Sequence, residues 1–246
     1  MEPIDKKQLG LRDGDYLYKC GSINGVGKDY YDMLADSMET VEFEVEYPKE
    51  WQEDVWYPLQ NYTDFLLDGK LQDEQVILDK ENIVRFWLYL QFLSASDNID
   101  KNFYILATEY DKQLLIQKIP WDMNYSFGDA WSVESPNITR FGVFGIDEIF
   151  SVQDYQNLYR NNEREISDLT SQMWSSMRQS IIQTDRLCGQ AAEYMSLLTE
   201  SGAFQRETLR WPEAGNSTDI TAIEGYIRDR IAFLDNAIAQ GNYGEE

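Results

Sequence analysis

The clearest hydrophobic pattern in the first quarter of the chain is a strict alternation of apolar and charged residues. It runs from Val41 to Tyr47 as Val-Glu-Phe-Glu-Val-Glu-Tyr, and Pro48 follows it. A period of two places the apolar residues on one face, which is typical of a half-buried strand. Residues 1–62 also carry the turn signal Asp13-Gly14. The pattern therefore predicts a lead-in that is rich in strands and loops.

A second pattern, denser in apolar residues, predicts a buried helix. Asp79 is a suitable N-cap for a helix from Lys80 to about Leu93. Little polar face remains on this helix, because its apolar residues are Ile83, Val84, Phe86, Trp87, Leu88, Leu90 and Phe92. Such a helix is expected in the interior of the fold. One or two short helices are expected before it, between Asp64 and Leu78.

The stretch after this helix predicts a β-hairpin between two polar loops. Phe103 to Ala107 and Leu114 to Ile119 are short apolar runs joined by a polar turn. The first loop covers residues 94–102, and the second runs from residue 120 to Gly128, where glycine permits a sharp turn. Because the two strands of a hairpin lie side by side, the two loops are expected to meet at one end of the sheet.

The second half of the chain has the apolar periodicity of helices. Four are predicted, at Gln153–Asn161, Glu163–Ile182, Gln183–Thr199 and Asp219–Ala239. The whole pattern indicates an α+β fold in a single domain of residues 1–246. Its parts are the strand- and loop-rich lead-in (1–62), a core that contains the hairpin (63–145) and a helical subdomain (146–246).

The charge of the chain narrows the classes of partner. The chain has 21 Lys and Arg against 44 Asp and Glu, which gives a formal net charge of −23. Such a charge repels phosphate backbones and anionic lipid heads, so nucleic acid and membrane surfaces are not expected partners. No apolar run reaches the ~20 residues that a transmembrane helix needs. The oligomeric state is left open by these observations.

The residue types exclude several kinds of site. The chain has no histidine, so Ser-His-Asp and Cys-His catalysis are excluded, and acid–base chemistry must use carboxylates or metal-bound species. The two cysteines lie far apart and outside any CxxC motif, which argues against a structural zinc site. Six residues are expected to be buried packing residues: Cys20, Cys188, Trp51, Trp56, Trp87 and Trp174.

Three polar residues around the hairpin are candidates for chemistry. Asp97 and Asn102 lie five apart in the first loop, and Asp122 lies in the second. Protein kinases arrange a catalytic Asp, a metal-binding Asn five residues later and a second metal-binding Asp in this order. The Asp-x4-Asn spacing alone also fits a turn or a helix cap. The hairpin and the corner Pro120-Trp121-Asp122 strengthen the kinase interpretation.

Phosphoryl transfer needs these residue types for a physical reason. A transferring phosphoryl group carries dispersed negative charge, so one or two Mg²⁺ must be held against it by hard oxygen ligands. Asn102 and Asp122 supply such oxygens, and Asp97 can orient the attacking hydroxyl. Three neighbouring residues are further candidates: Lys101, Trp121 and Asn124. Of these, Trp121 is equally compatible with a packing role.

The two loops carry longer motifs. From Asp97 to Tyr104 the chain reads D-N-I-D-K-N-F-Y, and from Ile119 to Gly128 it reads I-P-W-D-M-N-Y-S-F-G. These motifs resemble the patterns D-x-x-x-K-N-Y-Y and I-P-W-D-x-D-x-x-[FW]-G of the CotH (spore coat protein H) kinase family. A weaker likeness extends from Leu17 towards the C-terminal helices, so the resemblance covers nearly the whole chain.

The resemblance implies an atypical, secretory-kinase-like fold, of which this chain is the larger C-terminal lobe. It implies ATP with Mg²⁺ or Mn²⁺ as cofactors, and transfer of the γ-phosphate to Ser or Thr of spore coat or other extracytoplasmic proteins. Asp97 then takes the catalytic role, and Asn102 and Asp122 bind the metal and the nucleotide.

Two departures from the family pattern leave an alternative open. Asn124 stands where the family has a second Asp, although an amide oxygen can still bind a metal. No Gly-rich phosphate loop or Lys–Glu pair is visible, so we expect the N-terminal nucleotide-binding lobe to be missing. The alternative to an active kinase is a non-catalytic pseudokinase, or a binding or assembly module, on the same scaffold.

Overall fold

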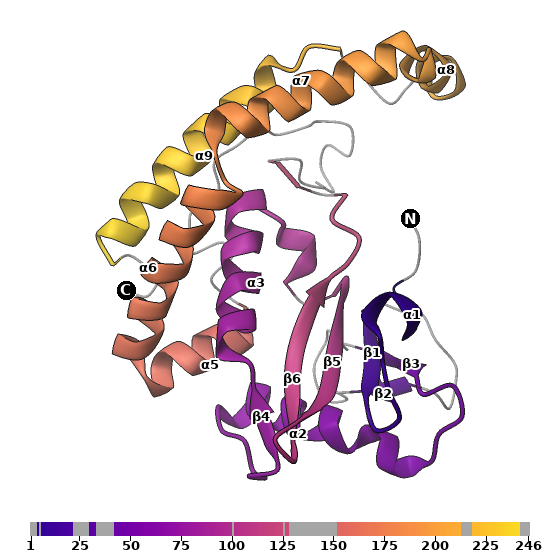
Figure 1. The fold of residues 1–246 in the computed structure, drawn as a ribbon, viewed down its shortest axis with the longest axis vertical. Coiled ribbons are helices and arrows are strands. Elements are labelled where there is room, and N and C mark those ends of the chain that lie inside the picture. The colour runs from indigo at the N-terminus through magenta and orange to yellow at the C-terminus, as the bar shows by residue number, and fades with distance from the viewer. Residues whose placement is uncertain are drawn as a thin grey trace.

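The chain folds as a mixed α+β structure in which a sheet and a mostly helical C-terminal half pack around one central helix (Figure 1). The structure, a computed structural model, describes residue 4 and residues 6–21, 30–32, 42–99, 101–124, 126–127, 152–212 and 218–241. The predicted α+β class is confirmed. Val41 and Gly128, which end the predicted strand and the predicted second loop, lie outside the described residues.

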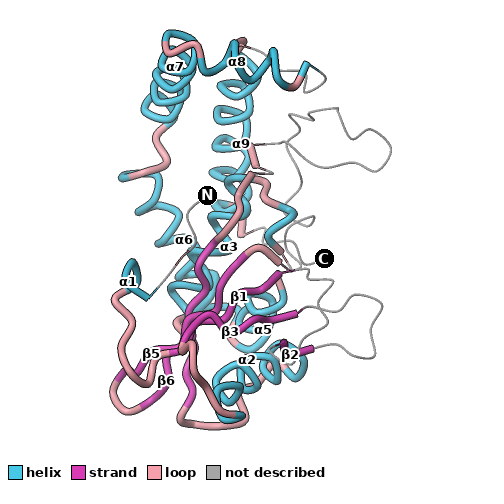
Figure 2. Tube along the Cα trace, turned by 90° about the vertical axis from the view of Figure 1, so that its right-hand side faces the viewer, coloured by secondary structure: helices cyan, strands magenta, loops and turns pink. Residues whose placement is uncertain are grey.

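Six strands form one sheet in the order β2-β3-β1-β5-β6-β4. They are β1 (Tyr16–Gly21), β2 (Tyr30–Asp32), β3 (Glu42–Tyr47), β4 (Val76–Leu78), β5 (Phe103–Tyr110) and β6 (Gln113–Pro120). β1 lies between β3 and β5 and is antiparallel to both, whereas β4 runs parallel to β6. The strands of the lead-in therefore continue the sheet of the predicted hairpin, β5 and β6 (Figure 2).

The alternating run forms a strand with alternating burial, as predicted, but its apolar residues do not all share one face. In β3, Phe43, Val45 and Tyr47 are buried, whereas Glu44 and Glu46 are partly exposed. The pairing of β3 with β1 shifts register after Val45, so Phe43 and Val45 belong to the larger apolar cluster and Tyr47 to the smaller one. The larger cluster faces the central helix. The smaller cluster, on the other face of the sheet, consists of Leu11, Leu17, Tyr47, Tyr104 and Leu106, with Leu9 of the short helix α1 (Lys6–Leu9) beside it.

The central helix α3 (Lys80–Leu93) begins and ends as predicted. Asp79 is its N-cap, and Asp79 Oδ1 accepts a hydrogen bond from Asn82 N at 2.9 Å. Its buried residues include every apolar residue of the predicted stripe. After Leu93 the backbone of Ser94 turns left-handed, with φ of 50°, and directs the chain into the first loop. This turn starts the segment that carries the candidate site.

We expect Asp79→Ala to lower the free energy of unfolding by about 1 kcal/mol, because an orphan N–H of the first helical turn loses its acceptor. Asp79 Oδ2 also accepts from Gln117 Nε2 at 2.7 Å, which ties the cap to β6. Urea unfolding measures the change. Asp79→Asn retains an acceptor oxygen and is expected to lose less than the alanine variant. Equal losses in the two variants would argue against the cap.

The segment before α3 differs from the prediction of one or two short helices between Asp64 and Leu78. A single helix, α2 (Tyr57–Asp68), starts seven residues earlier and follows the 3₁₀ turn η1 (Glu53–Trp56). Pro58 lies in its first turn, where a missing N–H costs nothing, and Gly69 ends it with φ of 73°. At the end of this segment, Val76–Leu78 form β4, which pairs with Leu114–Ile116 of β6.

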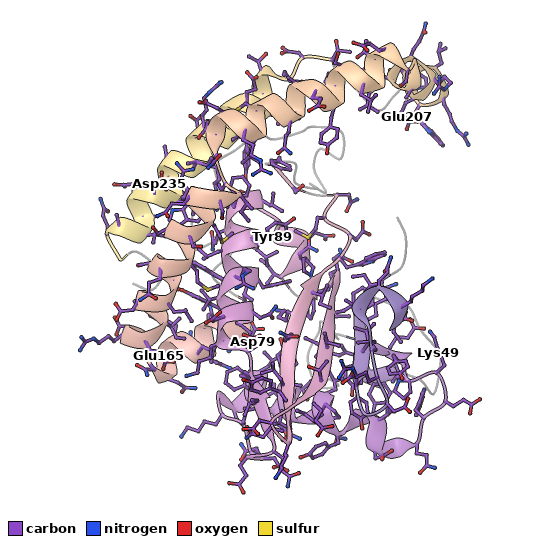
Figure 3. All side chains as sticks on the ribbon, in the orientation of Figure 1. Lys49, Asp79, Tyr89, Glu165, Glu207 and Asp235 are labelled. Carbon is purple, nitrogen blue, oxygen red and sulfur yellow. The ribbon has the colours of Figure 1, made fainter. Side chains whose placement is uncertain are left out.

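The described part of the C-terminal half contains five helices. They are α5 (Gln153–Asn161), α6 (Glu163–Ser180), α7 (Thr184–Glu200), α8 (Ala203–Arg210) and α9 (Thr221–Ala239). The four predicted helices are confirmed, with ends that agree within two residues. α8 was not predicted, and none of its residues is buried. α9 is fastened to α6 through Asp235, which accepts from Trp174 Nε1 at 2.8 Å (Figure 3).

A buried ion pair joins the sheet to the helical half. Lys118 Nζ on β6 lies 3.2 Å from Asp154 Oδ2 on α5, and the two side chains are 3% and 0% exposed. The same carboxylate oxygen accepts a hydrogen bond from Tyr62 Oη of α2 at 2.8 Å. The ammonium group also lies 4.3 Å from the ring centroids of Phe86 and Phe103. One charge pair therefore connects five elements of the core.

The expected packing roles of the cysteines and tryptophans are confirmed. Cys20 and Cys188 are buried and free, and burial raises the pKa of the Cys188 thiol. Trp56, Trp87 and Trp174 are buried, and Trp51 packs against the core while partly exposed.

Candidate functional site

The open end of the hairpin brings the two predicted metal ligands together. The last pair of the β5–β6 ladder is Phe103 with Pro120, so Asn102 and Trp121 face each other just beyond it. Trp121 N donates to Asn102 O at 3.0 Å, and Asp122 is the next residue. This end of the sheet lies beside the C-terminal end of α3 (Figure 1). The pairing of β5 with β6 thus brings Asn102 and Asp122 close together, although 20 positions separate them in the sequence.

Asp97 joins the same end of the sheet through its side chain. It lies in the 3₁₀ turn η2 (Ser96–Asn98) and is partly exposed. Its Oδ2 accepts a hydrogen bond from Asn102 Nδ2 at 2.6 Å, and its Oδ1 forms an ion pair with Lys101 Nζ at 2.9 Å. Both oxygens of the predicted catalytic carboxylate are therefore oriented by neighbouring cations or donors.

The backbone at the two candidate ligands is unusual. Asn102 has φ of 59° and Asp122 has φ of 51°, both in the left-handed region. Asn and Asp tolerate this region better than other residues with a Cβ, because their short polar side chains bond locally. Non-glycine residues held in this conformation tend to gather at functional sites, where the surrounding structure determines them.

The residue types at this junction include oxygen ligands of the kind that Mg²⁺ prefers. Asn102 Nδ2 donates to Asp97 O and Oδ2, so Asn102 Oδ1 takes no part in these two hydrogen bonds. Asp122 adds a carboxylate. Mg²⁺ typically takes one or two protein carboxylates and completes its shell with water and substrate phosphates. Among the described residues, no group of three or more Cys, Asp or Glu side chains is placed to hold a metal alone.

The three further candidates differ in their placement. Lys101 contacts Asp97 as described above. Trp121 stacks edge-to-face on Tyr104, with ring centroids 5.6 Å apart, which favours its packing role. Burial, with the nearby charges of Glu46 and Glu44, raises the pKa of Tyr104 to about 12. Asn124 is exposed and takes part in none of these contacts.

Helix α9 contacts the C-terminal end of α3, where the first loop begins. The Tyr226 hydroxyl lies 2.9 Å from Phe92 O and 2.7 Å from Ser94 Oγ, at the turn that leads to Asp97. Burial raises the pKa of Tyr226, so its hydroxyl stays a donor. The buried Arg230 guanidinium donates from Nε to Gln91 O at 2.7 Å. Local patterns gave no signal for these residues, because their partners lie more than 130 positions away.

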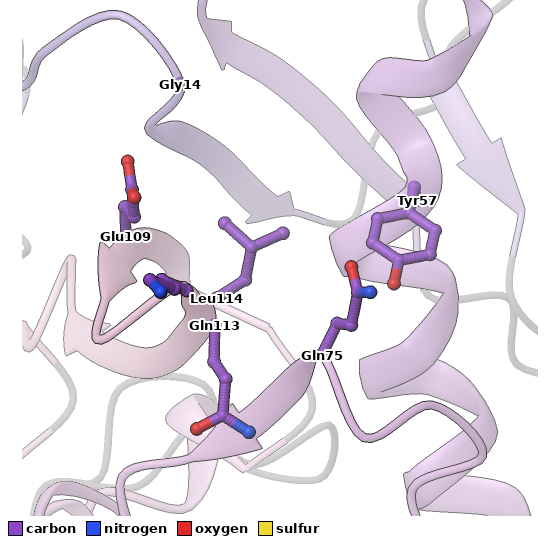
Figure 4. A pocket seen from close by; sticks show the side chains of 7 residues that line it. Gly14, Tyr57, Gln75, Glu109, Gln113 and Leu114 are labelled. Atoms are coloured by element: carbon purple, nitrogen blue, oxygen red, sulfur yellow. The ribbon is translucent and has the colours of Figure 1, made fainter.

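A small pocket lies at the opposite end of the hairpin. It has a volume of about 200 Å³ and is lined by Gly14, Tyr57, Gln75, Glu109, Lys112, Gln113 and Leu114 (Figure 4). At about 3.3 Å per strand residue, it is roughly 20–25 Å from Asn102 along β5. It is therefore separate from the candidate site.

The fold is that of a mixed α+β protein, and the two loops at the open end of the hairpin carry its candidate residues. A family model described as "CotH kinase protein" matches residues 1–234 of the 246. The chain belongs to the CotH kinase family, as its two loop motifs indicated. A search of curated proteins found no match. In the described part of the chain, no helix has the length and hydropathy needed to cross a membrane.

Proposed function

We propose that the chain is a metal-dependent phosphotransferase that moves the γ-phosphate of ATP to a Ser or Thr hydroxyl of a protein. Membership of the CotH kinase family supports a kinase-like function. The observation that carries the proposal is the junction at the open end of the hairpin, where Asn102 contacts the Asp97 carboxylate at 2.6 Å and pairs with Trp121, next to Asp122. Spore coat or other extracytoplasmic proteins are the acceptors that the family suggests.

In the proposed reaction the acceptor hydroxyl oxygen attacks the γ-phosphorus. A new O–P bond forms, the bond to the β–γ bridging oxygen breaks, and ADP leaves with that oxygen. Asp97 orients the hydroxyl and takes its proton on a carboxylate oxygen. Lys101, which holds Asp97 Oδ1 at 2.9 Å, provides a positive charge beside the reacting groups.

Asn102 and Asp122 are the ligands proposed for the metal. Bound Mg²⁺ or Mn²⁺ would supply positive charge to the phosphates during transfer. Asn102 Oδ1 and the Asp122 carboxylate would orient the nucleotide through it, while Asp97 remains available to the acceptor. This division of roles makes binding and transfer separable by mutation.

We expect Asp122→Ala to abolish binding of Mn²⁺-ATP without unfolding the chain. Ligand at ~100 times its dissociation constant adds about 2.7 kcal/mol of stability, which should raise the melting temperature of the parent by roughly 5–10 °C. The variant should show no rise, because the metal loses its carboxylate ligand. Thermal unfolding with and without Mn²⁺-ATP measures both.

Asp111→Ala is a matched control for this measurement. Asp111 is an exposed aspartate with a left-handed backbone, φ of 48°, in the turn at the other end of the hairpin. It should retain the full rise. A rise that persists in Asp122→Ala would remove Asp122 from the site. No rise in the parent would argue against the phosphotransferase and favour a non-catalytic binding module.

A further inference from the structure

We propose that Asn98 is a positioning residue that fixes the two candidate metal ligands relative to each other; this inference rests on the proposed function. The Asn98 side chain is buried at the open end of the hairpin. Its Nδ2 donates to Asn102 O at 2.9 Å and to Trp121 O at 2.7 Å. Both hydrogens of the amide are therefore used, one on each of the two loops.

The two accepting carbonyls control the orientation of the ligands directly. Asn102 O belongs to the peptide plane that follows Asn102, so holding it fixes ψ of Asn102. Trp121 O belongs to the peptide plane whose nitrogen is that of Asp122, so holding it fixes φ of Asp122. Both ligands have a left-handed backbone, with φ of 59° and 51°, and a restraint on the adjoining peptide planes helps to hold this conformation.

The other atom of the amide makes no comparable contact within the part of the chain that the structure describes. Asn98 Oδ1 is enclosed and has no hydrogen-bond partner among the described residues. A buried acceptor without a partner is unfavourable, so an apolar residue of the same shape would avoid this cost. An apolar residue, however, could not donate hydrogen bonds to Asn102 O and Trp121 O. The two N–H donors, placed between the two ligand loops, therefore account for an asparagine at this position.

The chain offers a matched control for Asn98. Asn82 on α3 also makes two side-chain hydrogen bonds, in this case with one residue of β6. Its Nδ2 donates to Lys118 O at 3.1 Å, and its Oδ1 accepts from Lys118 N at 2.6 Å. It thus links a neighbouring element to the same hairpin, four residues before Asp122, without touching either ligand loop.

The test compares Asn98→Leu with Asn82→Leu, because leucine retains the branched shape and removes the polar atoms. Titration calorimetry of the whole chain with Mn²⁺-ATP gives the dissociation constant, and thermal unfolding without ligand gives the loss of stability. Asn98→Leu is expected to raise the dissociation constant about 10–100-fold, the usual effect of losing a residue that orients metal ligands. Asn82→Leu is expected to bind as the parent does while losing stability.

Parental affinity in Asn98→Leu, or an equal loss of affinity in both variants, would overturn the positioning role. A second readout does not need nucleotide: the exchange rate of the Trp121 backbone amide, which donates to the same Asn102 O at 3.0 Å. It should increase in Asn98→Leu and not in Asn82→Leu. If the parent fails to bind Mn²⁺-ATP, the proposed function fails. Unchanged exchange at Trp121 would overturn the restraint itself.

Discussion

Replacing Lys118 with methionine is expected to lower the free energy of unfolding by about 3–5 kcal/mol, the usual cost of removing one partner of a buried ion pair. Among the described residues, the variant leaves the Asp154 carboxylate, which is 0% exposed, with the Tyr62 hydroxyl and a backbone N–H of its own helix as partners. It also removes the cation from between two aromatic rings. The melting temperature should fall by roughly 6–20 °C for a chain of this size.

Two comparisons isolate the buried pair in this experiment. In Lys118→Met with Asp154→Asn, the uncompensated charge is removed and an acceptor for Tyr62 is kept, so the double variant should be more stable than Lys118→Met alone. Lys80→Met removes a surface ion pair with Glu165, at 2.8 Å, and should cost under about 1 kcal/mol (Figure 3). If Lys118→Met lowered the free energy of unfolding as little as Lys80→Met does, the prediction would be contradicted.

Lys118 also shows how far local pattern predicts the core. Within β6 the period of two places Lys118 on the same face as Leu114 and Ile116, which points it towards α3. That signal is present in the sequence, but it indicates only that a charge enters the core. Its partner Asp154 lies 36 positions away and cannot be chosen by pattern from 44 acidic residues.

The elements that carry the candidate site were predictable because they depend on short-range signals. Patterns spanning a few residues correctly predicted the Asp79 cap, the apolar helix that follows it and the two paired strands β5 and β6. Pairing of the two strands then accounts for the approach of Asn102 and Asp122. The start of α2 was misplaced, and α8, a helix of eight residues with none buried, was not predicted.

The roles of the residues that support the site were not predictable, although Asn98 itself lies within the first loop motif. Asn98 uses its side chain on backbone carbonyls, and a carbonyl is the same at every residue type. Tyr226 and Arg230 likewise bond to backbone atoms at the end of α3, across more than 130 positions. Sequence motifs identify the atoms proposed to react, whereas the groups that orient them are found only in the folded chain.

The second large effect is expected at Asp97, on transfer and not on binding. Asp97→Asn should slow phosphoryl transfer by about 10²–10⁴-fold, because the amide cannot take the proton of the acceptor hydroxyl. The variant still offers an oxygen to Asn102 Nδ2, which lies 2.6 Å from Asp97 Oδ2, so the first loop should keep its shape. Affinity for Mn²⁺-ATP should stay near that of the parent, since Asn102 and Asp122 are the proposed ligands.

Single-turnover transfer from radiolabelled ATP with Mn²⁺ to a library of Ser- and Thr-containing peptides measures this effect. Asp111→Asn makes the same change in net charge at the other end of the hairpin and should transfer at the parental rate. If Asp97→Asn also transferred at that rate, Asp97 would serve only to hold Asn102. If Asp97→Asn both slowed transfer and weakened Mn²⁺-ATP binding to the same degree, Asp97 would instead belong to the metal site. Transfer can be lost without loss of binding only if the proton acceptor is not also a metal ligand.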